Sequence, residues 1–91
     1  MDVRMAKSKA GHDKDQIYVI IKEDREYVYL ADGKYRSVGN PKRKNKKHIQ
    51  MIRHIPKEAA ELLEQKAVPG DPEIKRALKL YQMRENSRSE D

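Results

Sequence analysis

Short apolar runs with a period of two residues, each closed by turn residues, most constrain how the first half of this chain can fold. The clearest run, residues 16–22 (QIYVIIK), places Ile17, Val19 and Ile21 on one face and Tyr18 and Ile20 on the other. Residues 3–9, 26–31, 34–38 and 48–52 follow the same pattern more loosely. Because successive side chains of a strand point to opposite faces, we predict five short β-strands in these runs.

The turn residues between the runs set the expected topology. Gly11 centres a turn at residues 10–15, and Asp32-Gly33 predicts a two-residue type I′ hairpin, because that turn needs positive φ at both central positions. Residues 34–38 would then return as the partner strand, and residues 42–47 would form an extended basic loop. Frequent turns between short strands are typical of a small barrel or sandwich, and this length suits a five-stranded SH3-like barrel. The alternative, a flat antiparallel sheet, would leave one face and two edges exposed.

The pattern changes to a helical period after residue 54. Pro56 precedes residues 57–66 (KEAAELLEQK), in which three apolar residues cluster at helical spacing, Ala59, Leu62 and Leu63. We therefore predict a mostly β fold with a barrel in residues 1–54 and a helical extension in residues 55–91.

Asp71 and Pro72 predict the start of a second helix, with Asp71 as the N-cap and Pro72 as the first helical residue. An apolar stripe follows at residues i, i+3, i+4 and i+7, which are Ile74, Ala77, Leu78 and Tyr81. We expect this helix to fray near Asn86 and residues 87–91 (SRSED) to be disordered. A lone helix of this kind is marginal in water, so the stripe should pack against the barrel or a partner, and we favour the barrel.

The composition restricts the kinds of chemistry that are open to the chain. It contains no Phe, Trp or Cys, so we expect an aliphatic core with some Tyr, no disulfide and no cysteine zinc site. The three histidines, His12, His48 and His54, match no metal-binding spacing, and the serines lie near no base or acid that would complete a catalytic set. No apolar run reaches the length of a membrane span and no signal-peptide core follows Met1, so we expect a soluble, intracellular, non-enzymatic protein without metal, cofactor or membrane partner.

The positive charge is concentrated in the first part of the chain. Residues 1–54 hold fourteen Lys or Arg and seven Asp or Glu, whereas residues 55–91 hold seven and eight. Five of the six residues 42–47 are cationic, and the nearest acid before them in the sequence is Asp32. Such a density repels itself unless a polyanion binds, so this pattern favours nucleic-acid phosphates as ligands over a merely solvated loop. Four tyrosines on the strands could also stack on unpaired bases, but we favour strand packing, because tyrosine is a common strand former and its ring covers a small core well; they are Tyr18, Tyr27, Tyr29 and Tyr35.

Three segments together resemble a known family. They are the AGHDK turn before an apolar strand, the YLADGKYR stretch, and the NPKRKNKKH loop that leads into HIQ. Over residues 3 to about 51, which contain these motifs, the chain resembles the KOW-domain RNA-binding proteins related to large-subunit ribosomal proteins of the fourteen-e type. The resemblance implies an SH3-like barrel that binds structured RNA, most often ribosomal RNA, in a cytoplasmic, ribosome-associated protein.

The resemblance also implies which residues contact RNA. They are Gly11, His12, Lys14, Lys34, Arg36, Lys42, Arg43, Lys44, Lys46, Lys47 and His48, and we expect Lys9 beside the turn to contact RNA as well. Asp15 departs from the family, which usually has glycine after the turn lysine; aspartate tolerates positive φ, but its charge would repel a phosphate. The alternative function is an adaptor that docks a ribosomal or other protein through the barrel or the C-terminal helix. An architectural DNA-binding role is weaker, because no helix carries the cations of a groove reader.

Overall fold

The computed structural model describes residues 4–89, and the side chains of residues 4–86. Its five antiparallel strands are β1 (Met5–Ser8), β2 (Ile17–Glu23), β3 (Tyr27–Ala31), β4 (Lys42–Asn45) and β5 (Ile49–Ile52). A 3-10 helix, η1 (Lys46–His48), follows β4, and two α-helices complete the chain, α1 (Lys57–Glu64) and α2 (Asp71–Ser89). The strands predicted at residues 3–9, 16–22, 26–31 and 48–52 are therefore present, with ends that differ by at most two residues, and residue 3 lies outside the described part.

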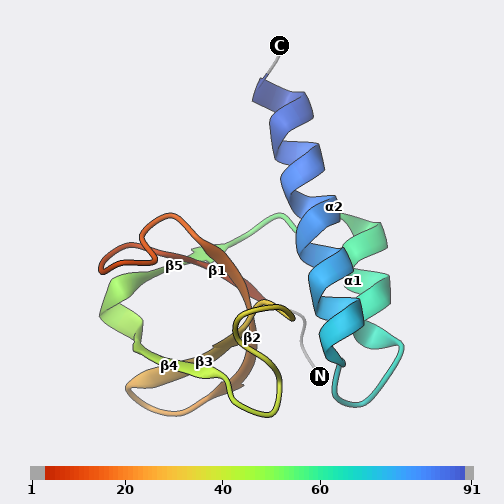
Figure 1. Ribbon diagram of the computed structural model, residues 1–91. Coiled ribbons are helices and arrows are strands. Elements are labelled where there is room, and N and C mark those ends of the chain that lie inside the picture. The colour runs from red at the N-terminus through yellow and green to blue at the C-terminus, as the bar shows by residue number, and fades with distance from the viewer. Residues whose placement is uncertain (1–3, 90–91) are drawn as a thin grey trace.

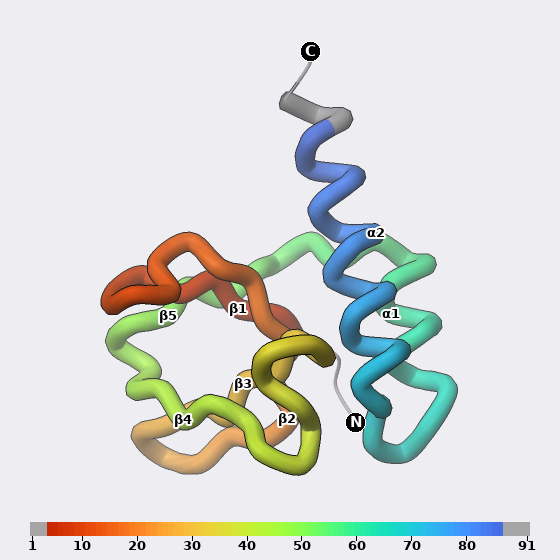
Figure 2. The backbone as a smooth tube through the Cα atoms, viewed as in Figure 1, coloured from red at the N-terminus to blue at the C-terminus, as the bar shows by residue number. Residues whose placement is uncertain are grey.

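The five strands form one curved sheet in the order β4-β3-β2-β1-β5, so the last strand pairs with the first (Figure 1). Met5 of β1 lies opposite Val19 of β2 on one side and Ile52 of β5 on the other. The edge strands β4 and β5 do not pair with each other within the described residues, and η1 connects them across the opening (Figure 2). The structure therefore shows an open, strongly curled five-stranded antiparallel sheet.

Each face of the sheet carries its own apolar cluster. The inner face buries Tyr18 and Ile20 of β2 against Val28 and Leu30 of β3. The outer face buries Val19 of β2, and the partly buried Ile17 and Ile21 pack on the same cluster. The two-faced pattern predicted for residues 16–22 is thus confirmed, and β2 lies at the centre of both clusters.

α2 packs against the outer face of the sheet, and α1 packs against α2 on the side away from the strands (Figure 1). Ile74, Ala77 and Leu78 of α2 are buried with Met5 and Val19, and Ala59 and Leu63 of α1 belong to the same cluster. This confirms that the apolar stripe of the second helix packs on the protein's own sheet. A partner therefore has no access to the buried part of the stripe.

Two details of α2 differ from the sequence predictions. The first helical hydrogen bond runs from Ile74 N–H to the carbonyl of Gly70, and the Gly70 N–H donates to Glu73 Oε1 at 3.0 Å. Gly70 is thus the N-cap and Asp71 the first helical residue, because the Asp71 carboxylate is occupied elsewhere: it accepts a hydrogen bond from Val38 N–H at 2.8 Å. The helix also continues to Ser89 rather than ending near Asn86, and residues 90–91 lie outside the described part.

The predicted hairpin at Asp32-Gly33 and the strand at residues 34–38 are wrong. Gly33 has a φ of +78°, as predicted, but residues 32–40 form an irregular loop. Asp32 Oδ1 accepts hydrogen bonds from the backbone N–H groups of Lys34 and Arg36, both at 2.8 Å, and these bonds fold the chain into a tight turn instead of a strand. The partner of β3 is β4, so the predicted basic loop is a strand followed by η1, and His48 belongs to η1.

Candidate nucleic-acid interface

The turn at residues 10–15 projects from the ends of β1 and β2. Gly11 and Asp15 have positive φ values, +91° and +73°, and Asp15 is the only non-glycine residue of the described chain with this conformation. The Asp15 N–H donates to the Ser8 carbonyl at 2.8 Å, which closes the turn. The expectation that aspartate would allow the turn to form is therefore confirmed.

Asp13 anchors this turn to the sheet. Its Oδ1 accepts hydrogen bonds from Ser8 Oγ at 2.8 Å and Lys44 Nζ at 2.7 Å. Its Oδ2 accepts one from Tyr18 O–H at 3.0 Å and pairs with Lys42 Nζ at 2.9 Å. The carboxylate thus joins the turn to β1, β2 and β4.

Burial and hydrogen bonds together shift the pKa values of the Asp13 and Tyr18 side chains. Burial alone raises the pKa of Asp13, but the hydrogen bonds from Lys44, Lys42, Ser8 and Tyr18 outweigh it and hold the pKa well below its usual range. Burial, and then the hydrogen bond to the Asp13 carboxylate, raise the pKa of Tyr18 above its usual range. Asp13 is therefore charged and Tyr18 neutral at physiological pH.

Three of the five cations in residues 42–47 have anionic partners. Lys42 and Lys44 pair with Asp13, and Lys46 Nζ pairs with Glu23 Oε2 at 2.8 Å. Arg4, followed by Lys46, lowers the pKa of Glu23 to about 2. No acid is near these lysines in the sequence, but the fold brings two acids to them, so the predicted uncompensated charge is partly neutralised.

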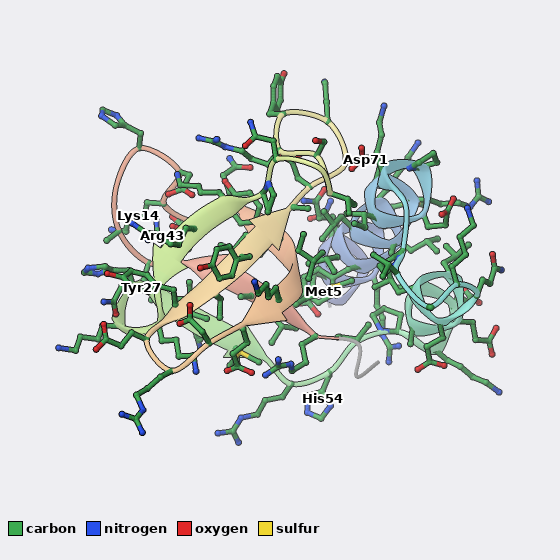
Figure 3. All side chains as sticks on the ribbon, turned by 90° about the horizontal axis from the view of Figure 1, so that it is seen from below. Met5, Lys14, Tyr27, Arg43, His54 and Asp71 are labelled. Carbon is green, nitrogen blue, oxygen red and sulfur yellow. The ribbon has the colours of Figure 1, made fainter. Side chains whose placement is uncertain are left out.

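Four other cations near this region form no ion pair within residues 4–86. They are Lys9, Lys14, Arg43 and Lys47, and all four are exposed. Arg43 points to the other face of β4 from Lys42 and Lys44, and its guanidinium lies 4.6 Å from the centroid of the Tyr27 ring. Figure 3 shows Lys14, Arg43 and Tyr27 on the side of the sheet that lies away from Asp71 and the helices.

Backbone contacts bring separate segments of the candidate site together. Lys44 Nζ donates to the carbonyl of Ala10 at 2.8 Å, which seats the turn beside β4. The Lys9 N–H donates to the His48 carbonyl at 2.7 Å, which places Lys9 beside η1. Gly11 lies at the tip of the turn, where a side chain would approach Lys44 Nζ.

The loop at residues 32–40 also lies beside the turn at residues 10–15 and β4. Arg36 of this loop lines a hollow together with His12 and Lys42, so the loop, the turn and β4 meet there. Lys34 instead lies over the ring of Tyr35 and lines a second hollow beside α2. The structure thus brings eleven of the twelve predicted residues into the region of the turn, β4, η1 and the first hollow, and places Lys34 at its margin.

Sequence reasoning missed the acids that organise this region. Asp13 and Glu23 were not candidates, although they hold Lys42, Lys44 and Lys46 in place. The only signal in the sequence was an acid between His12 and Lys14 in a turn before a strand. Its partner Lys44 is 31 residues away, so local pattern could not connect them.

Other kinds of site receive no support from the described residues. No group of three His, Cys, Asp or Glu side chains among them is arranged to hold a metal ion. None of the helices within residues 4–89 is both long and apolar enough to cross a membrane. A scan against protein-family models and a search of curated proteins found no match to this chain.

Proposed function

We propose that this chain is a non-enzymatic RNA-binding protein that contacts the phosphate backbone of structured RNA, with ribosomal RNA as the expected target in the cytoplasm. The observation that carries the proposal is the Asp13 network, which draws the basic turn against β4. As a result, exposed cations of the turn and of β4, about thirty residues apart in the sequence, lie on the same side of the sheet (Figure 3). Phosphate contacts position a protein on RNA without requiring a base code.

Neutralised and unpaired cations have different roles in this proposal. Lys42, Lys44 and Lys46 are held by carboxylates, so they shape the surface at little cost in self-repulsion. The unpaired cations, Lys9, Lys14, Arg43 and Lys47, can release counterions when they meet phosphates. We therefore assign most of the affinity to these four side chains.

We also infer that the curled sheet is an SH3-like barrel of the KOW type. The order of the strands supports this inference, because the last strand pairs with the first and η1 bridges the two edges. The positions of the AGHDK turn and the NPKRKNKKH segment support it as well, because the two motifs lie against each other in space.

The decisive experiment replaces Lys14, Arg43 and Lys47 with Gln and measures binding to a structured ribosomal RNA fragment by fluorescence anisotropy. Each phosphate contact contributes roughly 0.7 to 0.9 to the slope of log K against log salt, so the slope should fall by about 2 to 3. The matched control replaces three exposed helical cations, Lys57, Arg76 and Arg84, with Gln. This control removes the same charge and should leave the slope nearly unchanged.

The result that would overturn the proposal is equal weakening by both triple variants, because the effect would then reflect net charge alone. Absence of binding by the parent protein at low salt would also refute it. Unchanged thermal melts for both variants would show that the fold is intact, since exposed ion pairs contribute only about 0–1 kcal/mol to stability.

The alternative function is an adaptor that docks a protein partner. Its expected docking face, the apolar stripe of α2, is largely buried against the sheet. The exposed Met83 and the half-buried Leu80 near the C-terminal end of α2 remain as candidates for such a contact. Capture of a defined ribosomal protein that survives the Lys14, Arg43 and Lys47 substitutions and is lost on Met83→Ala would favour the adaptor.

A further inference from the structure

Tyr35 is the one large aromatic side chain that the described fold leaves in water. Its exposed fraction is 80%, whereas Tyr18 is buried at 5% and Tyr27 and Tyr29 are half-buried. An exposed ring at this position contributes nothing to the core, although a tyrosine ring offers a large apolar surface. The exposed Tyr35 ring is therefore a candidate contact for a ligand.

The tyrosines on β2 and β3 already have partners. The Tyr18 hydroxyl donates to Asp13, and the ring of Tyr27 is covered by Arg43 at 4.6 Å. Tyr29 is held from two directions: Lys22 lies 5.4 Å from its ring centroid, and its hydroxyl donates to Asp24 Oδ2 at 3.2 Å. Lys34 also lies over the Tyr35 ring, but Tyr35 is by far the most exposed of these four tyrosines, so most of its ring surface is open to a ligand.

The loop that carries Tyr35 is held at both ends. Asp32 Oδ1 binds the N–H groups on either side of Tyr35, those of Lys34 and Arg36. Gly33 packs so closely on the first turn of α2 that a Cβ there would collide with the Asp71 carbonyl and the Lys75 backbone. Farther along, the Val38 N–H binds Asp71 (the loop lies beside α2 in Figure 2). The ring is thus presented on a pre-organised turn, which lowers the entropy cost of binding.

The surroundings of the ring are cationic and polar. Lys34 Nζ lies 5.0 Å from the ring centroid, and Arg36 follows immediately in the chain. Tyr35 lines the same hollow as Arg36, Lys42 and His12, which connects the ring to the proposed phosphate-binding surface. An aromatic face beside phosphate-binding cations is the arrangement that proteins use for single-stranded nucleic acid.

We propose that Tyr35 stacks on an unpaired base of the RNA while Lys34 and Arg36 contact the flanking phosphates. This inference rests on the proposed RNA-binding function and deepens it, because it assigns the ligand class: an RNA segment with a splayed-out base, in a loop or bulge, rather than a fully paired helix. In a paired helix the bases are stacked on one another, and no base face is free to meet the ring.

The test compares Tyr35→Ala with Tyr35→Phe, using two fluorescently labelled RNAs, an unpaired dodecamer and a twelve-base-pair duplex. Tyr35→Ala should weaken binding to the unpaired RNA by about tenfold, whereas Tyr35→Phe, which keeps the ring, should bind as the parent does. Binding of the duplex should be unchanged in both variants, because it depends on the phosphate contacts alone. Equal affinity of parent and Tyr35→Ala for the unpaired RNA, or equal weakening for both RNAs, would overturn the stacking proposal.

A second variant reports stacking directly. The chain contains no tryptophan, so Tyr35→Trp introduces a single indole whose fluorescence should be quenched by the unpaired RNA and not by the duplex. Met83→Trp, at an exposed position that faces Pro56 and Lys57, is the control and should show no quenching with either RNA.

The outcomes separate this proposal from the proposed function. If the duplex still binds with a steep salt dependence but Tyr35→Trp is not quenched by unpaired RNA, stacking is wrong and phosphate binding stands. If the parent binds neither RNA at low salt, both proposals fail. Quenching of Met83→Trp equal to that of Tyr35→Trp would also overturn the assignment to Tyr35.

Discussion

The Asp13 network offers the sharpest prediction about what holds this surface together. In Asp13→Asn, the side chain keeps its shape and one acceptor oxygen but loses the negative charge that faces Lys42 and Lys44. The Asp13 side chain is only 11% exposed, and that of Lys44 is only 10% exposed. Water therefore replaces little of the lost interaction, and the substitution should destabilise the fold.

The size of the effect follows from the contacts. A hydrogen bond to a charged group contributes about 1.5–3 kcal/mol net. We expect the hydrogen bond from Lys44 to contribute this full amount to the free energy of unfolding. The bond from Lys42 should contribute less, because the Lys42 side chain is 26% exposed and its charge is partly screened by water. Lys44 also keeps its bond to the Ala10 carbonyl, which limits the loss. We expect the free energy of unfolding to fall by about 2–3 kcal/mol, or roughly 10–20 °C in Tm for a domain of this size.

The assay is thermal and urea unfolding followed by far-ultraviolet circular dichroism. The matched control is Asp15→Asn in the same turn, because Asp15 is exposed, pairs only weakly with Lys7 at 4.0 Å, and has a positive φ that asparagine also adopts. The control should melt within about 6 °C of the parent, since surface pairs contribute about 0–1 kcal/mol.

A second substitution tests why Asp13→Asn should be less stable than the parent protein. If Asp13→Asn is unstable because Lys44 is left partly buried without an anion, Lys44→Met should restore part of the lost stability in that background. Equal melts for Asp13→Asn and Asp15→Asn would refute the reasoning. A lower melt that Lys44→Met makes worse would show that the Asp13–Lys44 pair is not its source.

Three further predictions concern the pH dependence, the loop and the turn. The pKa of Asp13 in the folded protein lies below its ordinary value of 3.8, so the ionised carboxylate stabilises the fold above that pH. This stability is lost as the pH falls from about 5 through the pKa of the folded state. In an acid titration followed by unfolding, Asp13→Asn should therefore lose less stability than the parent protein. Gly33→Ala should lower the free energy of unfolding by more than about 1 kcal/mol in urea unfolding, because its φ is +78° and its Cβ would meet Asp71; a neutral result would show that the loop does not need this close contact. Asp15→Gly should bind RNA as tightly as the parent or more tightly in a fluorescence titration, since glycine also adopts a φ of +73° and removes a negative charge; clearly weaker binding would give Asp15 a positive role.

Apolar periodicity predicted the elements whose side chains pack in the core. Residues 16–22 have apolar residues on both faces, and the fold uses both: Ile20 faces the inside of the curled sheet and Val19 faces the helices. The same pattern could not identify β4, because Lys42–Asn45 contains no apolar residue. This edge strand is held instead by backbone pairing with β3 and by the reach of Lys42 and Lys44 to Asp13.

Long-range and turn-forming hydrogen bonds explain why the N-cap predicted at Asp71 and the hairpin predicted at Asp32-Gly33 are wrong. An Asp-Pro pair ordinarily marks an N-cap, but here Asp71 binds Val38, which is 33 residues away. The Asp32-Gly33 pair ordinarily marks a hairpin, but the Asp32 carboxylate satisfies the two backbone N–H groups that flank Tyr35. Which partner an Asp side chain binds depends on the groups that the whole fold brings next to it, and no local sequence pattern contains that information.

The shared core of the sheet and α2 also dictates when the protein can fold during its synthesis. Met5 and Val19 leave the ribosome before Ile74 and Leu78, which lie at least 55 residues later in the sequence and pack in the same cluster. Until then the outer face of the sheet lacks the cover of α2, and the loop at residues 32–40 has no Asp71 to bind. A nascent chain that pauses before Ile74 would therefore expose apolar strands and depend on chaperones, and the Tyr35 loop would become ordered only after the first turn of α2 has formed.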